Sequence, residues 1–376
     1  MSNKKTLILG GYGNAGLPLA GLLLAWTQAN VILAGRNLKK ARAAAQVFNQ
    51  RFPGERASAV QVDAANPDSL ASALPGVDLL VVASSTAQYA GRVARAAMDA
   101  GCNYLDLQYS RQKYLALQRL ASQIEAAGLC FITEGGFHPG LPAAMVRLAG
   151  RRLDRLERAL VGSVIKIDWA GLKFSRATIH EMVAELLDFD TQVYKDGRWQ
   201  TTSLTSTADF LTMDFGYPFG SQLCAPMFLE EMRPLPEKFP ELRETGFYVG
   251  GFNWFVDWLV LPVGYFAMRL WPDLALWPLG RLLEWGLRTF SQPPYGTRLK
   301  LEASGWHAGR QAHLQVLLSH PDGYWFTAIP VAATLLQVMD GSRRRTGLWT
   351  QGNLVDPERL LVDMQCMGVD VLIRME

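Results

Sequence analysis

The 376-residue sequence has few cysteines and little net charge. Its four cysteines lie far apart, with no C-x-x-C pair and no histidine at ligand spacing, which excludes the usual zinc and disulfide patterns. We therefore expect buried or incidental thiols, a reducing cytoplasmic location and no metal. The net charge of +3 comes from scattered lysines and arginines, so we expect no nucleic-acid partner.

Long apolar runs are also missing. Residues 5–25 resemble a secretory signal, but glycines dilute the run and no small-residue cleavage site follows, so we discount a signal. Residues 249–290 hold five tryptophans, yet charges interrupt both halves, whereas a span needs about 20 mainly apolar residues. Two short amphipathic helices are expected, lying on a bilayer surface or forming a lipophilic pocket or subunit contact. The alternative is buried core between domains.

The strongest motif that is present follows the apolar run Leu7–Leu9. Gly11, Gly13 and Gly16 have the spacing G-x-G-x-x-G, and a segment typical of a helix, 17–25, comes next. In a strand–turn–helix context these glycines permit a tight turn, close approach of a pyrophosphate and close helix packing. The helix N-terminus favours the phosphates. We predict a dinucleotide site formed by Gly10, Gly11, Tyr12, Gly13, Asn14, Ala15 and Gly16.

The end of the second predicted strand, 30–34, indicates which dinucleotide binds. An acidic residue there would select the ribose 2′-OH of NAD, but the sequence has Gly35, Arg36 and Asn37. Arg36 can stack on adenine and pair with a 2′-phosphate, assisted by Lys39 and Lys40. We expect NADP(H) in preference to NAD. The alternative is an ordinary basic start of a helix.

Further predicted strands at 59–63, 77–83, 103–107 and 129–133 alternate with helices, which indicates a Rossmann-like, doubly wound parallel sheet. Asp63 and Ala64 end one strand where such folds meet the adenine. Ser84 and Ser85 end the next at the ligand-binding edge of the sheet, although Ser and Thr there are equally typical of a helix N-cap.

After residue 150 the pattern changes to an inserted α+β unit with an antiparallel sheet. We expect a long strand at 160–169, a helix at 175–189, a hairpin around Asp196-Gly197 and a pair of strands at 298–304 and 311–319. A helix at 326–340 should return to the first domain. The predicted domains are 1–150 for the nucleotide, 151–325 for substrate and dimerisation, and 326–376 for returning C-terminal helices.

The chain resembles the saccharopine dehydrogenase-like family of NAD(P)-dependent reductases. The resemblance lies in the segments 10–16, 34–37, 62–64, 100–107 and 136–141, and more loosely in 322–324. It implies a nucleotide domain interrupted by an α+β domain that supplies substrate contacts and often the dimer interface, so a homodimer is expected. Relatives that act on amino acids need clustered cations, whereas Lys166, Lys173, Arg176 and Arg298 are scattered here.

Candidate proton donors near the nicotinamide are His138, Asp106, Tyr104 and Tyr109, although a loop histidine is more often structural. His180-Glu181 lacks the second histidine of a zinc protease, and no Gly-x-Ser-x-Gly elbow occurs. Three functions stay open: an NADP-dependent reductase of a C=N or C=C bond in a partly apolar small-molecule substrate, a reductase of an amino-acid-derived imine, and a non-catalytic redox sensor or membrane-associated scaffold.

Overall fold

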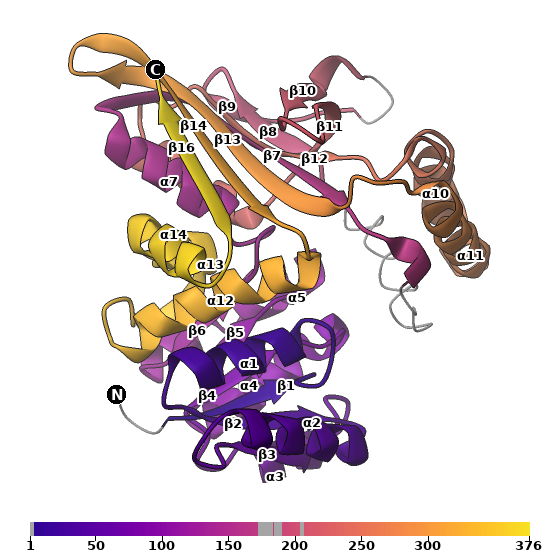
Figure 1. The fold of residues 1–376 in the computed structure, drawn as a ribbon, viewed down its shortest axis with the longest axis vertical. Helices are drawn as coiled ribbons and strands as arrows, with labels where there is room; N and C mark the ends of the chain where they lie inside the picture. Colours follow the sequence, from indigo (N-terminus) through magenta and orange to yellow (C-terminus); the bar gives the residue numbers. More distant parts are fainter. Residues whose placement is uncertain (1–3, 172–182, 184–189, 204–206) are drawn as a thin grey trace. The chain divides into compact units, whose positions relative to one another are not determined.

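A computed structural model describes residues 4–171, 183, 190–203 and 207–376. The chain forms two compact units (Figure 1). Unit 1 comprises Met1–Ala144 and Tyr324–Met367, and unit 2 comprises Met145–Gly323 and Gly368–Glu376. The helix α7 (Pro142–Arg152) carries the chain from one unit into the other.

Unit 1 is built on a seven-stranded sheet in the order β15-β6-β5-β4-β1-β2-β3. Every pair in it is parallel. The strands are β1 (Lys5–Leu9), β2 (Asn30–Gly35), β3 (Ala57–Gln61), β4 (Leu79–Val82), β5 (Asn103–Asp106), β6 (Cys130–Thr133) and β15 (Gly347–Thr350). The predicted Rossmann-like, doubly wound sheet is confirmed.

Helices cover both faces of this sheet, as expected when nearly continuous apolar strands such as β4 are buried on both sides. They are α1 (Gly16–Trp26), α2 (Leu38–Arg51), α3 (Pro67–Ala73), α4 (Ala90–Asp99), α5 (Arg111–Gln118), α6 (Ala121–Ala126), α12 (Gly323–Met339), α13 (Gln351–Leu354) and α14 (Pro357–Cys366). Asn37 and Asn66 cap α2 and α3 through their side-chain oxygens. Helix α12 is apolar on all sides and almost entirely buried.

Unit 2 contains a nine-stranded sheet in the order β10-β11-β12-β7-β13-β14-β16, with β8 paired to β12 and β9. The strands are β7 (Arg155–Lys166), β8 (Gln192–Lys195), β9 (Arg198–Thr201), β10 (Leu211–Asp214), β11 (Ser221–Met227), β12 (Glu244–Gly250), β13 (Gly296–His307), β14 (Arg310–His320) and β16 (Asp370–Met375). The pairing is antiparallel, as expected, except that β12 runs parallel to β7.

The hairpins of unit 2 follow the turn chemistry of the sequence. Asp196 and Gly197 both have positive φ, 52° and 79°, which is the type I′ conformation expected between β8 and β9. β13 and β14 pair along their whole length and are longer than predicted. The long strand expected at 160–169 begins earlier, at Arg155, and ends at Lys166. The helix expected at 175–189 lies outside the described residues, apart from Val183.

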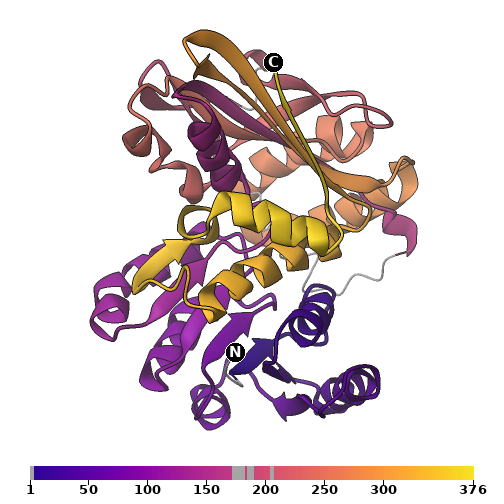
Figure 2. The ribbon, with the colours of Figure 1, turned by 60° about the vertical axis from the view of Figure 1, so that its left-hand side comes forward.

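The C-terminal segment divides between the two units. The helix expected at 326–340 is α12, and together with β15, α13 and α14 it belongs to unit 1. The final segment differs from the expectation of returning helices, because β16 pairs with β14 in unit 2 (Figures 1 and 2). Its alternation of half-buried and exposed residues is that of a strand with one covered face.

Residues 249–290 form helical segments beyond β12. A π-helical turn (Val256–Val260) leads into α10 (Leu261–Leu270), and α11 (Pro272–Phe290) follows and packs against α10. The remaining helical segments of unit 2 are α9 (Leu235–Lys238) and the 3₁₀ turns Trp169–Gly171, Thr207–Asp209 and Glu230–Met232. Among the described helices, none combines the length and apolarity that a bilayer span requires.

Candidate functional site

The glycine turn joins β1 to α1 through close backbone contacts. Gly10 has a φ of +86°, a conformation that favours glycine, and its N–H donates to Ala34 O at 2.8 Å. The N–H of Gly13 donates to Gly10 O, also at 2.8 Å. These bonds fold the turn back over the ends of β1 and β2 and direct the chain into α1.

The glycines of the turn lack side chains for two different reasons. A Cβ on Gly10 would lie 2.6 Å from Ala83 O, and a Cβ on Gly16 would overlap Gly10 O. A Cβ on Gly13 would meet only Gly10 O, at 3.1 Å, among the described atoms within 4 Å. Gly10 and Gly16 therefore serve the packing of the turn, whereas Gly13 faces open space where a pyrophosphate can approach.

The start of α1 completes an anion site beside Gly13. The first turn of α1 carries no acidic residue, and Leu17 N–H closes onto Gly13 O at 2.9 Å. In the described part of the chain, the N–H groups of Asn14 and Ala15 form no backbone hydrogen bond. Free N–H groups and the positive end of the helix dipole both favour a phosphate. The turn therefore fits a dinucleotide.

Tyr12 and the end of β2 lie next to this anion site. The Tyr12 hydroxyl accepts a hydrogen bond from Asn37 N–H at 2.9 Å, and its ring lies where a side chain on Gly35 would be. Arg36, next to this contact, is exposed. Within the described residues, neither Arg36 nor Lys39 or Lys40 forms an ion pair, so their charges are available to a ligand.

Four other predicted residues, two after β3 and two after β4, lie at the same edge of the sheet. Asp63, after β3, is exposed and accepts from Ala65 N–H at 3.0 Å, while Ala64 is buried. Ser84, after β4, lies beside the glycine turn, because a Cβ on Gly10 would be 2.8 Å from Ser84 Cβ. Its hydroxyl bonds the Thr86 hydroxyl at 3.1 Å and caps no helix, whereas Ser85 is exposed.

A buried ion pair lies at the ends of β5 and β6. Asp106 and Lys113 are fully buried, with Lys113 Nζ 2.5 Å from Asp106 Oδ1. The other carboxylate oxygen, Oδ2, accepts from Thr133 Oγ1 at 2.9 Å, and Glu134 N–H donates to Oδ1 at 3.3 Å. Lys113 also donates to Gln108 O. Both charges are therefore satisfied inside the protein, as buried charges require.

Tyr104 is buried near Asp106 on β5, whereas His138, after β6, is half-buried with both ring nitrogens enclosed. Burial, and after it the charge and hydrogen bond of Asp106, raise the pKa of Tyr104 well above its usual value. Burial lowers the pKa of His138 to about 3, and its ring packs edge-on against Phe137. Tyr104 therefore keeps its proton at neutral pH, and His138 is a neutral imidazole.

Comparisons with known proteins agree with this geometry. Residues 6–132 match the family described as the saccharopine dehydrogenase NADP binding domain. That segment contains the glycine turn, Arg36 and the Asp106–Lys113 pair. The nucleotide-binding part of this chain is thus similar to that of the saccharopine dehydrogenase-like family of NADP-binding oxidoreductases. The resemblance seen in the sequence is confirmed.

One solved structure extends the likeness to the whole fold of the chain. Apo saccharopine dehydrogenase (L-Glu forming) from Saccharomyces cerevisiae superposes with a TM-score of 0.71 at 16% identity, covering 99% of this chain and 100% of that one. A myo-inositol dehydrogenase from Corynebacterium glutamicum reaches a TM-score of 0.45 at 12% identity, covering 97% and 95%. No curated protein matches the sequence.

Lys113 is the residue of this site that sequence reasoning missed. It lies on α5, three residues after the capping Ser110, in a helix that also carries Arg111, Gln112 and Gln118. A lysine in such a helix is normally solvated, and burial requires a partner. The signal that was available is the polar Asp106 at the end of an apolar strand, which needs a cation when it is buried.

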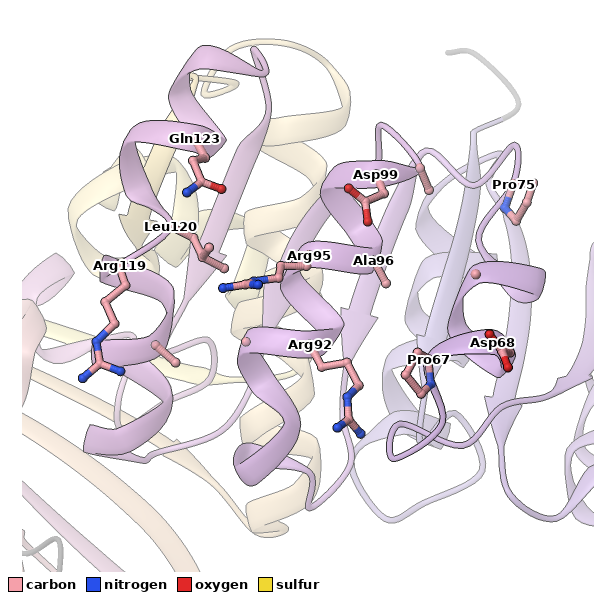
Figure 3. Close-up of a pocket in the computed structure, with 14 residues that line it drawn as sticks. Pro67, Asp68, Pro75, Arg92, Arg95, Ala96, Asp99, Arg119, Leu120 and Gln123 are labelled. Atoms are coloured by element: carbon pink, nitrogen blue, oxygen red, sulfur yellow. The ribbon is translucent and has the colours of Figure 1, made fainter.

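The structure also contains a groove away from the glycine turn. A cavity of about 1010 Å³ lies among α3, α4, α5 and α6, and the side chains of Arg92, Arg95 and Arg119 line it (Figure 3). None of the residues predicted to bind the cofactor lines this groove. In the part of the chain that the structure describes, no group of His, Cys, Asp and Glu is placed to hold a metal.

Proposed function

We propose that the protein is an NADP-dependent oxidoreductase that transfers hydride to a C=N or C=C bond of a small, partly apolar substrate. The observation that carries the proposal is the exposed Arg36 after β2, which forms no ion pair and follows a glycine turn open at Gly13. An arginine pairs with a 2′-phosphate at the position where an acidic residue would select NAD.

Different residues of unit 1 would bind different parts of the cofactor. The turn at Gly13 and the N–H groups of Asn14 and Ala15 would hold the pyrophosphate. Arg36, assisted by Lys39 and Lys40, would bind the 2′-phosphate. Asp63, Ala64, Ser84 and Ser85 follow β3 and β4 at the edge where open α/β sheets bind ligands. When bound, the nicotinamide supplies the hydride, and the protein supplies placement and a proton.

The proposed proton-handling groups are His138, Asp106 and Tyr104. Asp106 is held by Lys113 and Thr133, so we assign it the role of orienting its neighbours rather than exchanging a proton. Tyr104 is buried next to the Asp106 charge, which raises its pKa, so it retains its proton. Neutral His138 is suited to hydrogen-bond a substrate or relay a proton, and it does not act as an imidazolium acid near neutral pH.

The cations of unit 2 favour a partly apolar substrate over an amino acid. Arg298 donates to Phe215 O at 2.5 Å and to Gly216 O at 3.2 Å, and its guanidinium stacks on Phe219. Lys300 Nζ is engaged by Asp214 O and Glu302, both at 2.7 Å. These side chains hold strands of the sheet together. A substrate carboxylate would have to compete with those bonds, and Lys173 and Arg176 lie outside the described residues.

Replacing Arg36 tests the cofactor assignment. In Arg36→Ala we expect the affinity for NADPH to fall by about 1.5–3 kcal/mol, roughly 10–150-fold, because a charge-assisted pair with the 2′-phosphate is lost. NADH affinity should stay the same. Isothermal titration calorimetry with both cofactors measures the difference. Arg51→Ala, at the other end of α2, removes the same charge away from the site and should change neither affinity.

Equal affinity of the unaltered protein for NADPH and NADH would contradict the proposed preference. Selective NADPH binding without oxidation of NADPH by any imine or enone in a substrate panel would instead favour the non-catalytic sensor. Turnover confined to amino-acid-derived imines would favour the second sequence-based alternative.

A further inference from the structure

A series of hydrogen bonds crosses the carboxyl ends of three neighbouring strands of unit 1. It begins at Thr133, the last residue of β6, whose hydroxyl donates to Asp106 at the end of β5 at 2.9 Å. Asp106 pairs with Lys113 Nζ, and Lys113 also donates to the backbone oxygen of Gln108. The side-chain amide of Gln108 donates to Ser84 O, after β4. The loop after β5 is therefore tied to the ends of both neighbouring strands.

The last of these bonds acts on the backbone of the segment 84–86. Ser84 O accepts Thr86 N–H at 2.8 Å, which folds the segment into a tight turn, and the half-buried Gln108 donates to the same oxygen. Because the turn has a bond of its own, loss of the Gln108 amide would leave its local fold in place. What would be lost is the attachment of the turn to the loop after β5.

The segment 84–86 lies beside the glycine turn. A Cβ on Gly10 would be 2.6 Å from Ala83 O and 2.8 Å from Ser84 Cβ, so no side chain fits between the two loops. Ala83 N–H also donates to Leu9 O at 2.8 Å. A shift of Ser84 would therefore change the spacing between the loop after β4 and the turn proposed to hold the pyrophosphate.

The strand order indicates which half of a dinucleotide this segment would serve. Within the sheet the strands run β6-β5-β4-β1-β2-β3, so the direction of winding reverses between β1 and β4. Dinucleotides bind across the crevice at such a reversal, with one mononucleotide on each side. Arg36, after β2, is proposed to bind the 2′-phosphate of the adenosine half. This leaves the ends of β4 and β5, with Ser84 and Gln108, to the nicotinamide half.

We propose that Gln108 is a positioning residue for the nicotinamide half of the cofactor. By holding Ser84 O, it fixes the loop after β4 beside the glycine turn, and the buried pair of Asp106 and Lys113 anchors Gln108 in turn. A loop that is already held in place loses less conformational freedom when a ligand binds, so the affinity is higher. This inference rests on the proposed NADP(H) site.

The proposal also gives the buried ion pair a role besides stability. Burying two charges is costly, and apolar residues of similar volume are often as stable, so such a pair is weak evidence for stability alone. Lys113 has two acceptors in the described chain, and the second is Gln108 O rather than a carboxylate. The pair thereby fixes the path of the loop after β5. An apolar pair would fill the same space without holding that loop.

Gln108→Met tests the proposal, because methionine keeps the length of the side chain and removes the donor. Isothermal titration calorimetry compares NADPH with adenosine 2′,5′-bisphosphate, which carries the adenine, the 2′-phosphate and a 5′-phosphate but no nicotinamide. Affinity for NADPH should fall about fivefold, as expected for the loss of one hydrogen bond. Affinity for the bisphosphate should not change. Gln112→Met, at an exposed glutamine of α5, is the matched control and should change neither affinity.

A second measurement reports on the nicotinamide itself. In protein saturated with NADPH, the fluorescence anisotropy of the nicotinamide should be lower for Gln108→Met than for the unaltered protein, because a loosened loop lets the ring move. The melting temperature should stay the same, since Ser84 O keeps the Thr86 N–H as a donor. Should Gln108→Met not fold, Gln108→Ser, whose side chain is too short to reach Ser84, replaces it.

Two results with the Gln108 variant would overturn the proposal. The first is an unchanged affinity for NADPH. The second is an equal loss of affinity for NADPH and for the bisphosphate, since Gln108 would then act on the whole site rather than on its nicotinamide half. Failure of the unaltered protein to bind either compound is a different result, which would contradict the proposed function and overturn this inference with it.

Discussion

Gly13→Val should abolish NADP(H) binding, with a loss of more than about 100-fold in affinity, while the protein stays folded. The Gly13 Cβ position contacts only Gly10 O, at 3.1 Å, among the described atoms, so the added isopropyl group extends into open space. That space is where the pyrophosphate would approach the backbone. The core of unit 1 does not use it.

Gly16→Val is the matched control, because it makes the same substitution three residues later with the opposite expected result. Its Cβ would overlap Gly10 O and lie 2.9 Å from Gly11 Cα, so the turn must shift. Overpacking of this kind costs about 1–3 kcal/mol or more, and the melting temperature should fall. NADPH fluorescence titration and thermal unfolding of both variants distinguish the roles. Normal cofactor binding by Gly13→Val would mean that the phosphates bind elsewhere.

Lys113→Met should destabilise the protein by about 3–5 kcal/mol, because it leaves the Asp106 carboxylate buried without its cation. Asp106 would keep neutral donors such as the Thr133 hydroxyl and the Glu134 N–H. Methionine has a similar length and fills the space, so a cavity does not account for the loss. Urea unfolding followed by circular dichroism measures the change.

The double variant Asp106→Asn/Lys113→Met removes both charges and should regain part of the lost stability. Lys195→Met, at an exposed lysine of the β8–β9 hairpin, should leave the midpoint of unfolding unchanged. An unchanged midpoint in Lys113→Met as well would contradict the buried ion pair. A double variant less stable than Lys113→Met alone would show that packing rather than charge holds this site.

Local patterns in the sequence were sufficient to predict most of the secondary structure of unit 1. Strands covered on both faces read as apolar runs, and the turn after Leu9 depends on glycines only a few residues apart. Ser84 and Gly10 lie close together because they follow β4 and β1, which are parallel neighbours in the sheet. The sequence alone could therefore predict the fold class and the position of the glycine turn.

Contacts between distant segments were harder to predict. Lys113 reads as a solvated helical residue until the fold brings it against Asp106. β16 follows α14 in the chain, and only its pairing with β14 places it in unit 2. The parallel alignment of β12 with β7 depends on a connection of many residues between them, which local periodicity does not determine.

The tryptophan-rich segment 249–290 illustrates a second limit of the sequence. Its sequence excluded a simple span through its charges, but the same residues fitted a pocket wall, buried core or a lipid surface. The structure separates the two sides of each helix, with Met268 and Leu283 inward and Trp271 and Leu274 outward. Buried core therefore accounts for one face of each helix only, and the other face is exposed.

Amide hydrogen exchange with and without NADPH tests the central claim, which is that unit 1 holds the cofactor along the glycine turn and the end of β2. The account predicts slower exchange on NADPH addition in peptides covering residues 10–17 and 36–40, with a smaller effect at 84–86. Peptides from β13 and β14 serve as the internal reference for residues outside the proposed cofactor contacts. Binding of NADPH without protection of residues 10–17 would contradict the account.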